Sequence, residues 1–279
     1  MKAIQARDDE DGDKLAAGIK AAIQRGALQP DPPVEPTCRI EVMGKSADAV
    51  AAEIIQKLGR APSTGCVLIL QGLSGTGKGT TVSKLEAALP RAVCWSNGNV
   101  FRSLTLLAVS YCEANEIPFG PDALTGAVLN RLMQCLSFGK YNGKFDIKIE
   151  GYGLNLMVSE VANTTLKEPR VGRNIPTVAK VTQGEVIKFA GDAAAKMRDD
   201  GMNVLMEGRA QTLDFVRTPH RFELTLAEPL IIGKRRAAQR MMAAALVRLQ
   251  KAEKPVAGSI DETEQVTKAL SDELETMAA

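Results

Sequence analysis

The stretch QGLSGTGKGTT, residues 71–81, contains the residue types that bind phosphate. Glycines let several backbone amides converge on one anion, and the N-terminus of a following helix adds partial positive charge. The lysine of the stretch can reach the outer phosphates of a nucleotide, and a threonine hydroxyl can ligate Mg²⁺. The predicted binding residues are Gly72, Ser74, Gly75, Gly77, Lys78, Gly79, Thr80 and Thr81. The alternative is a glycine turn without a ligand, a conformationally costly way to reverse a chain.

Four arginines, each at a predicted strand end or loop, are candidates for binding a second phosphate. One guanidinium group can donate two parallel hydrogen bonds to a phosphate. The carboxyl ends of the strands in an α/β sheet form its ligand crevice. These residues are Arg102, Arg170, Arg173 and Arg209. Glu207 ends the apolar stretch NVLME, from which a carboxylate can orient Mg²⁺ or its water molecules. The alternatives are solvated arginines paired with surface carboxylates and a glutamate that only ends a strand.

The order of these stretches resembles that of the nucleoside monophosphate kinases, and of the cytidylate kinase family most closely. Within residues 66–242, GLSGTGKGT resembles that family's phosphate loop and SNGNVFR resembles its DSGxxYR. FDIKIEGYGLNLMVSEVAN resembles its inserted β-hairpin with the following EVAN, EPRVGR resembles FPRVR, and LMEGRA resembles ADGRD.

The resemblance implies a fold, cofactors and a substrate. The fold is a P-loop nucleotide-kinase-like three-layer α/β sandwich with a short parallel sheet and a small inserted β-hairpin. ATP and Mg²⁺ are the implied cofactors, and a nucleoside monophosphate is the implied acceptor. Lys78 and Arg209 would act in phosphoryl transfer, and Thr80 and Glu207 would hold the metal. The acceptor would be bound by Asn97, Arg102, Arg170, Arg173 and Arg209.

On the acceptor side, several positions depart from the family's pattern. Ser96 and Asn97 stand where the family has Asp and Ser. Ala210 and Leu166 replace family residues that read the cytosine base. Because those hydrogen-bonding groups are missing, we do not expect a strong preference for cytidylate.

The lid over the transferring phosphate also departs from the family. No arginine follows Arg248, so the late lid arginine and the final strand are unrecognisable. Arg236 and Arg240, four residues apart on a predicted helix, share one face and are candidate catalytic substitutes, together with Arg235. Their alternative is the basic surface of an amphipathic helix.

The pattern around these residues predicts an α/β domain at residues 61–279. CVLILQG reads as a buried parallel strand, and RAVCWSNG, NVLMEG and FELTLAE read as further strands. Helices are predicted after the glycines, through NVFRSLTLLAVSYCEANE, from Pro121 to Cys135, over residues 176–200 and through GKRRAAQRMMAAALVRLQK. Residues 139–157 are predicted to form the inserted antiparallel hairpin.

Residues 1–60 are predicted to form a helical extension with a linker, QPDPPVEP, ahead of the main fold. It contains an extended piece, CRIEVM, and a helix that begins after a predicted N-cap at Ser46. Since this extension carries no catalytic pattern, it is where we expect any protein partner to bind.

Composition argues against several other classes of protein. The 279 residues are 45% hydrophobic, which suits one sizeable core. A net charge of +2 and only 4% aromatic residues argue against nucleic acid as the main ligand. No apolar run approaches the roughly 18 to 20 residues that span a bilayer. The acidic N-terminus and five cysteines without a CxxC pair predict an intracellular protein, cytoplasmic by default, or one of an organelle matrix after presequence removal.

Two functions stay open on the sequence. The phosphate loop and the arginines favour ATP-dependent phosphoryl transfer to a nucleoside monophosphate. The altered lid and acceptor positions, together with the long extension, favour a catalytically inactive kinase-like domain. Such a domain would act as a structural or regulatory subunit of a larger assembly.

Overall fold

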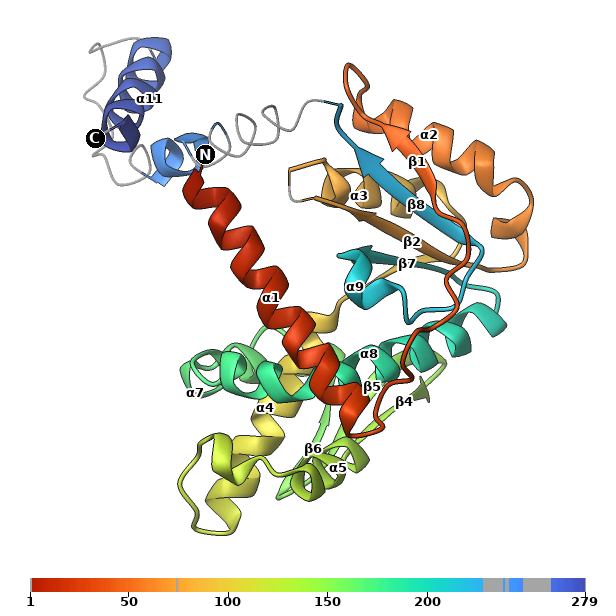
Figure 1. Ribbon diagram of the computed structural model, residues 1–279, viewed down its shortest axis with the longest axis vertical. Coiled ribbons are helices and arrows are strands. Elements are labelled where there is room, and N and C mark those ends of the chain that lie inside the picture. The colour runs from red at the N-terminus through yellow and green to blue at the C-terminus, as the bar shows by residue number, and fades with distance from the viewer. Residues whose placement is uncertain (1, 74, 228–237, 239–240, 248–261, 279) are drawn as a thin grey trace.

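The computed structural model contains a five-stranded parallel sheet flanked by helices, which confirms the α/β class (Figure 1). It describes residues 2–73, 75–227, 238, 241–247 and 262–278. The strands are β1 Cys38–Glu41, β2 Val67–Gly72, β3 Ala92–Trp95, β7 Asn203–Gly208 and β8 His220–Thr225. Their order is β1-β8-β2-β7-β3, and every neighbouring pair is parallel. The carboxyl ends of all five strands therefore meet along one edge.

Helices cover both faces of this sheet, because the side chains of β2 alternate between two hydrophobic cores. Leu68 and Leu70 lie in the core formed with α2 and α3. Val67 and Ile69 lie in the core formed with α8 and α9. The bounds are α2 Ala47–Leu58, α3 Lys78–Ala88, α8 Ile175–Asp199 and α9 Ala210–Leu213. The continuous apolar run of the sequence thus forms a strand that is buried on both faces.

The edge strand beside β8 comes from the N-terminal part of the chain. β1 pairs in parallel with β8 along its whole length. α2 begins after Ser46, whose hydroxyl accepts a hydrogen bond from the backbone amide of Ala49, as its predicted N-cap role requires. α2 then packs on α3. Residues 38–58, expected ahead of the main fold, therefore contribute a strand and a helix to it.

The inserted segment forms three antiparallel strands instead of a two-stranded hairpin. They are β4 Leu136–Tyr141, β5 Lys144–Gly151 and β6 Leu154–Met157, in that order. The prediction of residues 139–157 covered β5 and β6 but only the second half of β4. Asn142 and Gly143, both at positive φ, join β4 to β5. An Asn-Gly pair is the strongest short hairpin signal in a sequence, and it would have revealed β4.

The helix predicted to begin at Pro121 begins later, and that prediction is wrong. Pro121–Ala123 form a single 3-10 turn, and α5 spans Gly126–Gln134. Thr125 is the N-cap of α5, and its hydroxyl accepts a hydrogen bond from the backbone amide of Val128. The capping threonine therefore sets the start of this helix, and the proline sits in the preceding turn.

α1, Lys2–Gln24, packs against α8, whose bounds agree with the predicted helix of residues 176–200. The two helices approach closely at Gly184, where an added Cβ would lie 2.2 Å from the Cβ of Ala22. The remaining elements are η1 Ala61–Ser63, α4 Asn97–Ala114, η2 Pro121–Ala123, α6 Val158–Val161, η3 Thr165–Lys167, α7 Pro169–Gly172 and α11 Glu262–Ala278.

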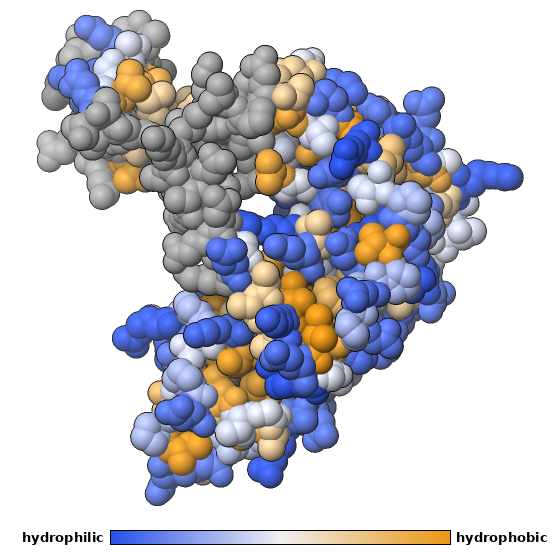
Figure 2. Space-filling view, in the orientation of Figure 1, coloured by the Kyte–Doolittle hydropathy of each residue, from blue (hydrophilic) through white to orange (hydrophobic). Residues whose placement is uncertain are grey.

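Hydrophilic residues cover most of the face seen in Figure 2, with smaller hydrophobic areas in its lower half. Within the described residues, no helix combines the length and the apolar character needed to cross a membrane. The helix predicted through residues 233–251 is helical where it is described, at residues 238 and 241–247. Its other residues lie outside the described part of the chain.

Candidate functional site

The glycine loop joins the end of β2 to the start of α3 at the carboxyl edge of the sheet. Gly72, Gly75 and Gly77 have φ values of +147°, +89° and +90°, which residues with a side chain rarely adopt. Gly77 is the N-cap of α3, and Lys78 is the first helical residue. The loop therefore leads directly into a helix N-terminus, where the first backbone amides have no partner within the helix. Ser74, also predicted to bind phosphate, lies outside the described residues.

The Lys78 ammonium lies against the loop. Its Nζ donates hydrogen bonds to the carbonyl oxygens of Gly72, at 2.8 Å, and Leu73, at 2.9 Å. The Thr76 hydroxyl donates to the same Leu73 carbonyl at 2.8 Å. Positive charge is thus fixed beside the amides that the sequence predicts to bind phosphate.

Glu207, at the end of β7, lies beside the first turn of α3. A Cβ added to Gly79 would be 3.9 Å from both carboxylate oxygens of Glu207. Thr80 is exposed, whereas Thr81 is buried, so Thr80 is the threonine open to a ligand. In the described part of the chain, no three His, Cys, Asp or Glu side chains gather as a metal site. Mg²⁺ at Thr80 and Glu207 would therefore also need phosphate oxygens, the coordination it commonly has.

Gln71 is a residue of this edge that the sequence reasoning missed. Its side chain is buried, and its Oε1 has no hydrogen-bond partner in the described part of the chain. Gln71 lies in register with Gly208 on β7 and Glu223 on β8, directly before the phosphate loop. A buried amide oxygen without a partner is costly unless water or a ligand satisfies it. The sequence signal that could have identified Gln71 is that it is the single polar side chain at the end of the apolar run CVLILQG.

Asn97 and Arg102 lie in the N-terminal turns of α4, which follows β3. The Oδ1 atom of Asn97 accepts a hydrogen bond from Trp95 Nε1 at 2.8 Å, so its Nδ2 is the group left for a ligand. The Arg102 guanidinium folds back towards the helix start, with Nη1 3.0 Å from a Cβ added to Gly98. No hydrogen bond or ion pair joins Arg102 to another described residue. β3 is two strands from β2, about 10 Å across the sheet.

Arg170, on α7, and Arg173, the C-cap of α7, do not join this group. Arg170 Nε donates to Glu168 at 2.9 Å, and Arg170 Nη1 lies 3.2 Å from a carboxylate oxygen of Glu113. The hydrogen bond to Glu168 and the charges of both carboxylates raise the pKa of Arg170 above its usual value. Arg102 and Glu113 lie about 16 Å apart along α4. The structure thus pairs Arg170 with carboxylates near the far end of α4, and Arg173 Nε donates to the Pro169 carbonyl.

Arg209 is the N-cap of α9, just after the end of β7. Its Nη1 lies 3.2 Å from a Cβ added to Gly12, so α1 passes directly over the guanidinium. Residues 8–13 of α1 read DDEDGD, a stretch with five acidic residues. The sequence reasoning missed α1 as a neighbour of this arginine. The available signal was a glycine inside an acidic helical stretch.

Arg221, on β8, fixes the segment that follows α9. It is 1% exposed, and its Nη1 donates to the carbonyls of Leu213 and Val216, both at 3.1 Å. Its Nη2 forms an ion pair with Asp214 at 2.5 Å. This buried arginine was not among the predicted site residues. It holds α9, and with it the backbone of Arg209, against the sheet.

The predicted lid arginines, Arg235, Arg236 and Arg240, lie outside the described residues. Neither a scan against models of known protein families nor a search of curated proteins finds a match for this chain. The geometry at the carboxyl edge of the sheet is therefore the basis for a functional conclusion.

Proposed function

We propose that the chain is an ATP-dependent phosphotransferase acting on a nucleoside monophosphate, with a P-loop nucleotide-kinase-like sandwich of the cytidylate kinase type. The observation that carries this proposal is the loop after β2. Its glycines have positive φ, Lys78 Nζ lies on its carbonyls, and Glu207 lies beside the following helix. These groups fit a nucleotide phosphate and its metal ion.

In this reaction, the loop amides and Lys78 hold the phosphates of ATP. Thr80 and Glu207 hold Mg²⁺, which neutralises charge on the phosphate oxygens. Arg102 and the Nδ2 of Asn97 bind the acceptor phosphate at the adjacent strand end. Arg209, after β7, contributes a further positive charge between these two groups, since β7 lies between β2 and β3. Phosphoryl transfer then depends on positioning and charge, and no covalent intermediate with the protein is needed.

The second candidate is a kinase-like domain without activity that serves as a subunit of a larger assembly. Two contacts favour it: Arg170 is paired with Glu113 and Glu168, and α1 covers Arg209. Under this alternative, the loop binds nucleotide weakly or not at all, and the acidic α1 occupies the acceptor side.

Nucleotide binding is tested by the melting temperature with and without Mg²⁺-ATP. At 100 times the dissociation constant, a ligand stabilises the folded state by about 2.7 kcal/mol. For a chain of this size, we expect a rise of roughly 5–10 °C in wild type. Lys78→Ala should abolish most of it. The matched control is Lys84→Ala on the same helix, where Lys84 pairs with Asp48. If ATP raises the melting temperature equally in wild type and Lys78→Ala, the loop assignment fails.

Catalysis is tested by ADP formation over a panel of nucleoside monophosphates. If the chain is an active phosphotransferase, ADP formation should depend on the acceptor nucleotide and should be lost in Arg102→Ala. Because Ala210 and Leu166 lack the family's base-binding groups, CMP and UMP should differ by less than about 100-fold. A thousandfold preference for CMP would contradict this view of the acceptor site. Nucleotide binding without ADP from any acceptor would leave the inactive subunit as the function.

A further inference from the structure

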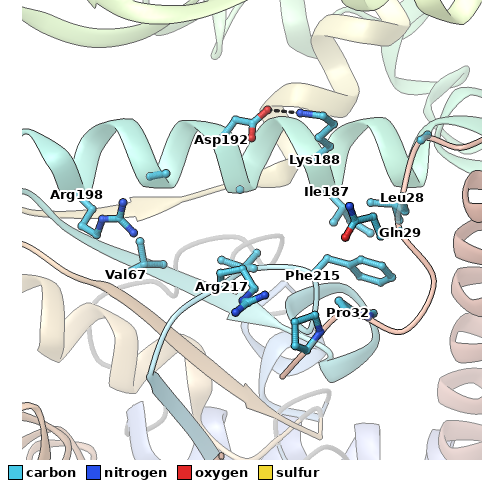
Figure 3. Close-up of a pocket in the computed structure, with 15 residues that line it drawn as sticks. Leu28, Gln29, Pro32, Val67, Ile187, Lys188, Asp192, Arg198, Phe215 and Arg217 are labelled. Atoms are coloured by element: carbon cyan, nitrogen blue, oxygen red, sulfur yellow. Dashed lines mark hydrogen bonds and ion pairs between the residues drawn. The ribbon is translucent and has the colours of Figure 1, made fainter. Parts of the chain in front are cut away.

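A cavity of about 410 Å³ lies near the amino ends of the strands, away from the phosphate loop. Val67, the first residue of β2, lines it, whereas the loop begins at Gly72, about 17 Å further along the strand. Its walls come from α8, from the segment between α9 and β8, and from the linker between α1 and β1 (Figure 3). Its volume falls within the range of small-molecule sites, roughly 300–1,000 Å³.

Gly191 lies on the α8 wall of this cavity, and neither packing nor backbone conformation requires a glycine there. Apart from its chain neighbours and the backbone of its own helix, no atom of the described residues lies within 4 Å of a Cβ added to Gly191, and its φ is not positive. Gly184, seven residues earlier on the same helix face, differs because α1 packs tightly on it. Glycine inside a helix is less favourable than alanine. The absent side chain at Gly191 leaves open the part of this face that α1 does not cover.

Two arginines line one end and the middle of the cavity, and apolar side chains line its other end. Figure 3 shows Arg198 and Val67 at one end, Arg217 in the middle, and Leu28, Ile187, Phe215 and Pro32 at the other end. Lys188 and Asp192, also at the cavity, form an ion pair with each other at 2.6 Å, which neutralises both charges. Arg198 and Arg217 also form ion pairs, with Asp199 at 2.6 Å and with Glu35 at 3.3 Å, so the two arginines offer a ligand their remaining hydrogen-bond donors.

Both arginines keep donors that no described residue uses. Arg198 donates from Nε and Nη2 to one oxygen of its neighbour Asp199, at 2.9 and 2.6 Å. Arg217 donates only from Nε, to Glu35 at 3.3 Å. Nη1 of Arg198 and both Nη atoms of Arg217 thus have no partner in the described part of the chain. Guanidinium donors of this kind bind carboxylates strongly and with defined geometry.

We propose that this cavity binds a small carboxylic acid with an apolar body. The carboxylate is bound by Arg198 and Arg217, and the apolar body lies along Gly191 towards Ile187 and Phe215. Because the linker before β1 forms one wall, the bound acid also stabilises the packing of that linker on α8. This site does not depend on the proposed phosphotransfer, since it shares no residue with the phosphate loop.

The test is isothermal titration of the full chain with octanoate. Octan-1-ol and octylamine should bind at least about tenfold more weakly than octanoate. The carboxylate can accept paired, charge-assisted hydrogen bonds from a guanidinium, whereas the alcohol has one neutral acceptor and the ammonium has none. Arg198→Gln and Arg217→Gln should each weaken octanoate binding by about tenfold. Arg131→Gln, which removes an exposed arginine on α5 away from the cavity, is the control and should leave binding unchanged.

Two substitutions of Gly191 separate the cavity from the rest of the protein. Gly191→Ala adds one methyl group to open space and should keep octanoate binding within a factor of about 3, with a melting temperature at or above wild type. Gly191→Leu should fill the cavity and weaken binding by at least about tenfold. The proposal is overturned if wild type does not bind millimolar octanoate. It is also overturned if octan-1-ol binds as tightly as octanoate, or if Gly191→Leu binds like wild type.

Discussion

Asn203 joins the beginnings of three strands through one buried amide, and we predict that Asn203→Ala strongly destabilises the sheet. The residue has no exposed surface. Its Oδ1 accepts hydrogen bonds from the backbone amide and the thiol of Cys66, both at 3.2 Å. Its Nδ2 donates to the carbonyls of Pro62, at 3.0 Å, and Pro90, at 2.6 Å. One side chain at the start of β7 therefore fixes the chain ahead of β2 and β3.

The size of the effect follows from the four hydrogen bonds that alanine cannot make. At about 1 kcal/mol net for each bond, the free energy of unfolding should fall by about 3–5 kcal/mol. For a chain of this length, 1 kcal/mol shifts the melting temperature by about 2–4 °C. A decrease on the order of 10 °C is expected.

Asn203→Asp tests the reason for this loss, because it keeps the shape of the side chain. A carboxylate can still accept from Cys66, but it cannot donate to the two proline carbonyls. At neutral pH, we expect Asn203→Asp to be at least as unstable as Asn203→Ala. As the pH falls, the carboxyl group gains a proton and one donor, so the difference from wild type should shrink.

The measurement is urea unfolding, with midpoints and slopes compared between variants. Asn155→Ala is the control, because Asn155 is exposed on β6 and its side chain makes no hydrogen bond to another described residue. If Asn203→Ala lies within about 1 kcal/mol of Asn155→Ala, the buried amide does not hold the strands as described.

Two further predictions concern pH and helix packing. Burial lowers the pKa of His220, the only histidine of the chain, below its usual 6.5. The unfolded chain then binds this proton more readily, so stability should decrease as the pH falls below about 6.5. In His220→Gln, the urea midpoint should decrease less over the same pH range. Parallel pH profiles of the urea midpoint for wild type and His220→Gln would contradict this prediction. On α8, Gly184→Ala should lower the melting temperature because its methyl group meets Ala22, whereas Gly191→Ala should not. If calorimetry gives both variants the same change in melting temperature, α1 does not pack closely on α8 at Gly184.

The sequence alone determined the parts of the molecule that are encoded by neighbouring residues. The apolar run before Gly72 became β2, and the glycines placed a tight turn ahead of α3. The helical period over residues 176–200 became α8, and the Ser46 hydroxyl caps α2. Each of these depends on local backbone geometry or on burial of a single element, so the pattern within one stretch was sufficient.

Only the tertiary structure decided which of the chemical residues stand together. It placed β1 at the sheet edge beside β8, although 178 residues of chain lie between their ends, and it laid α1 over Arg209. It also separated Arg170 from Arg102 by pairing Arg170 with Glu113. A guanidinium beside an apolar stretch reads the same in sequence whether it binds a phosphate or a carboxylate. Its partner is set by contacts between distant segments, and those depend on how whole faces of helices and sheet edges are buried together.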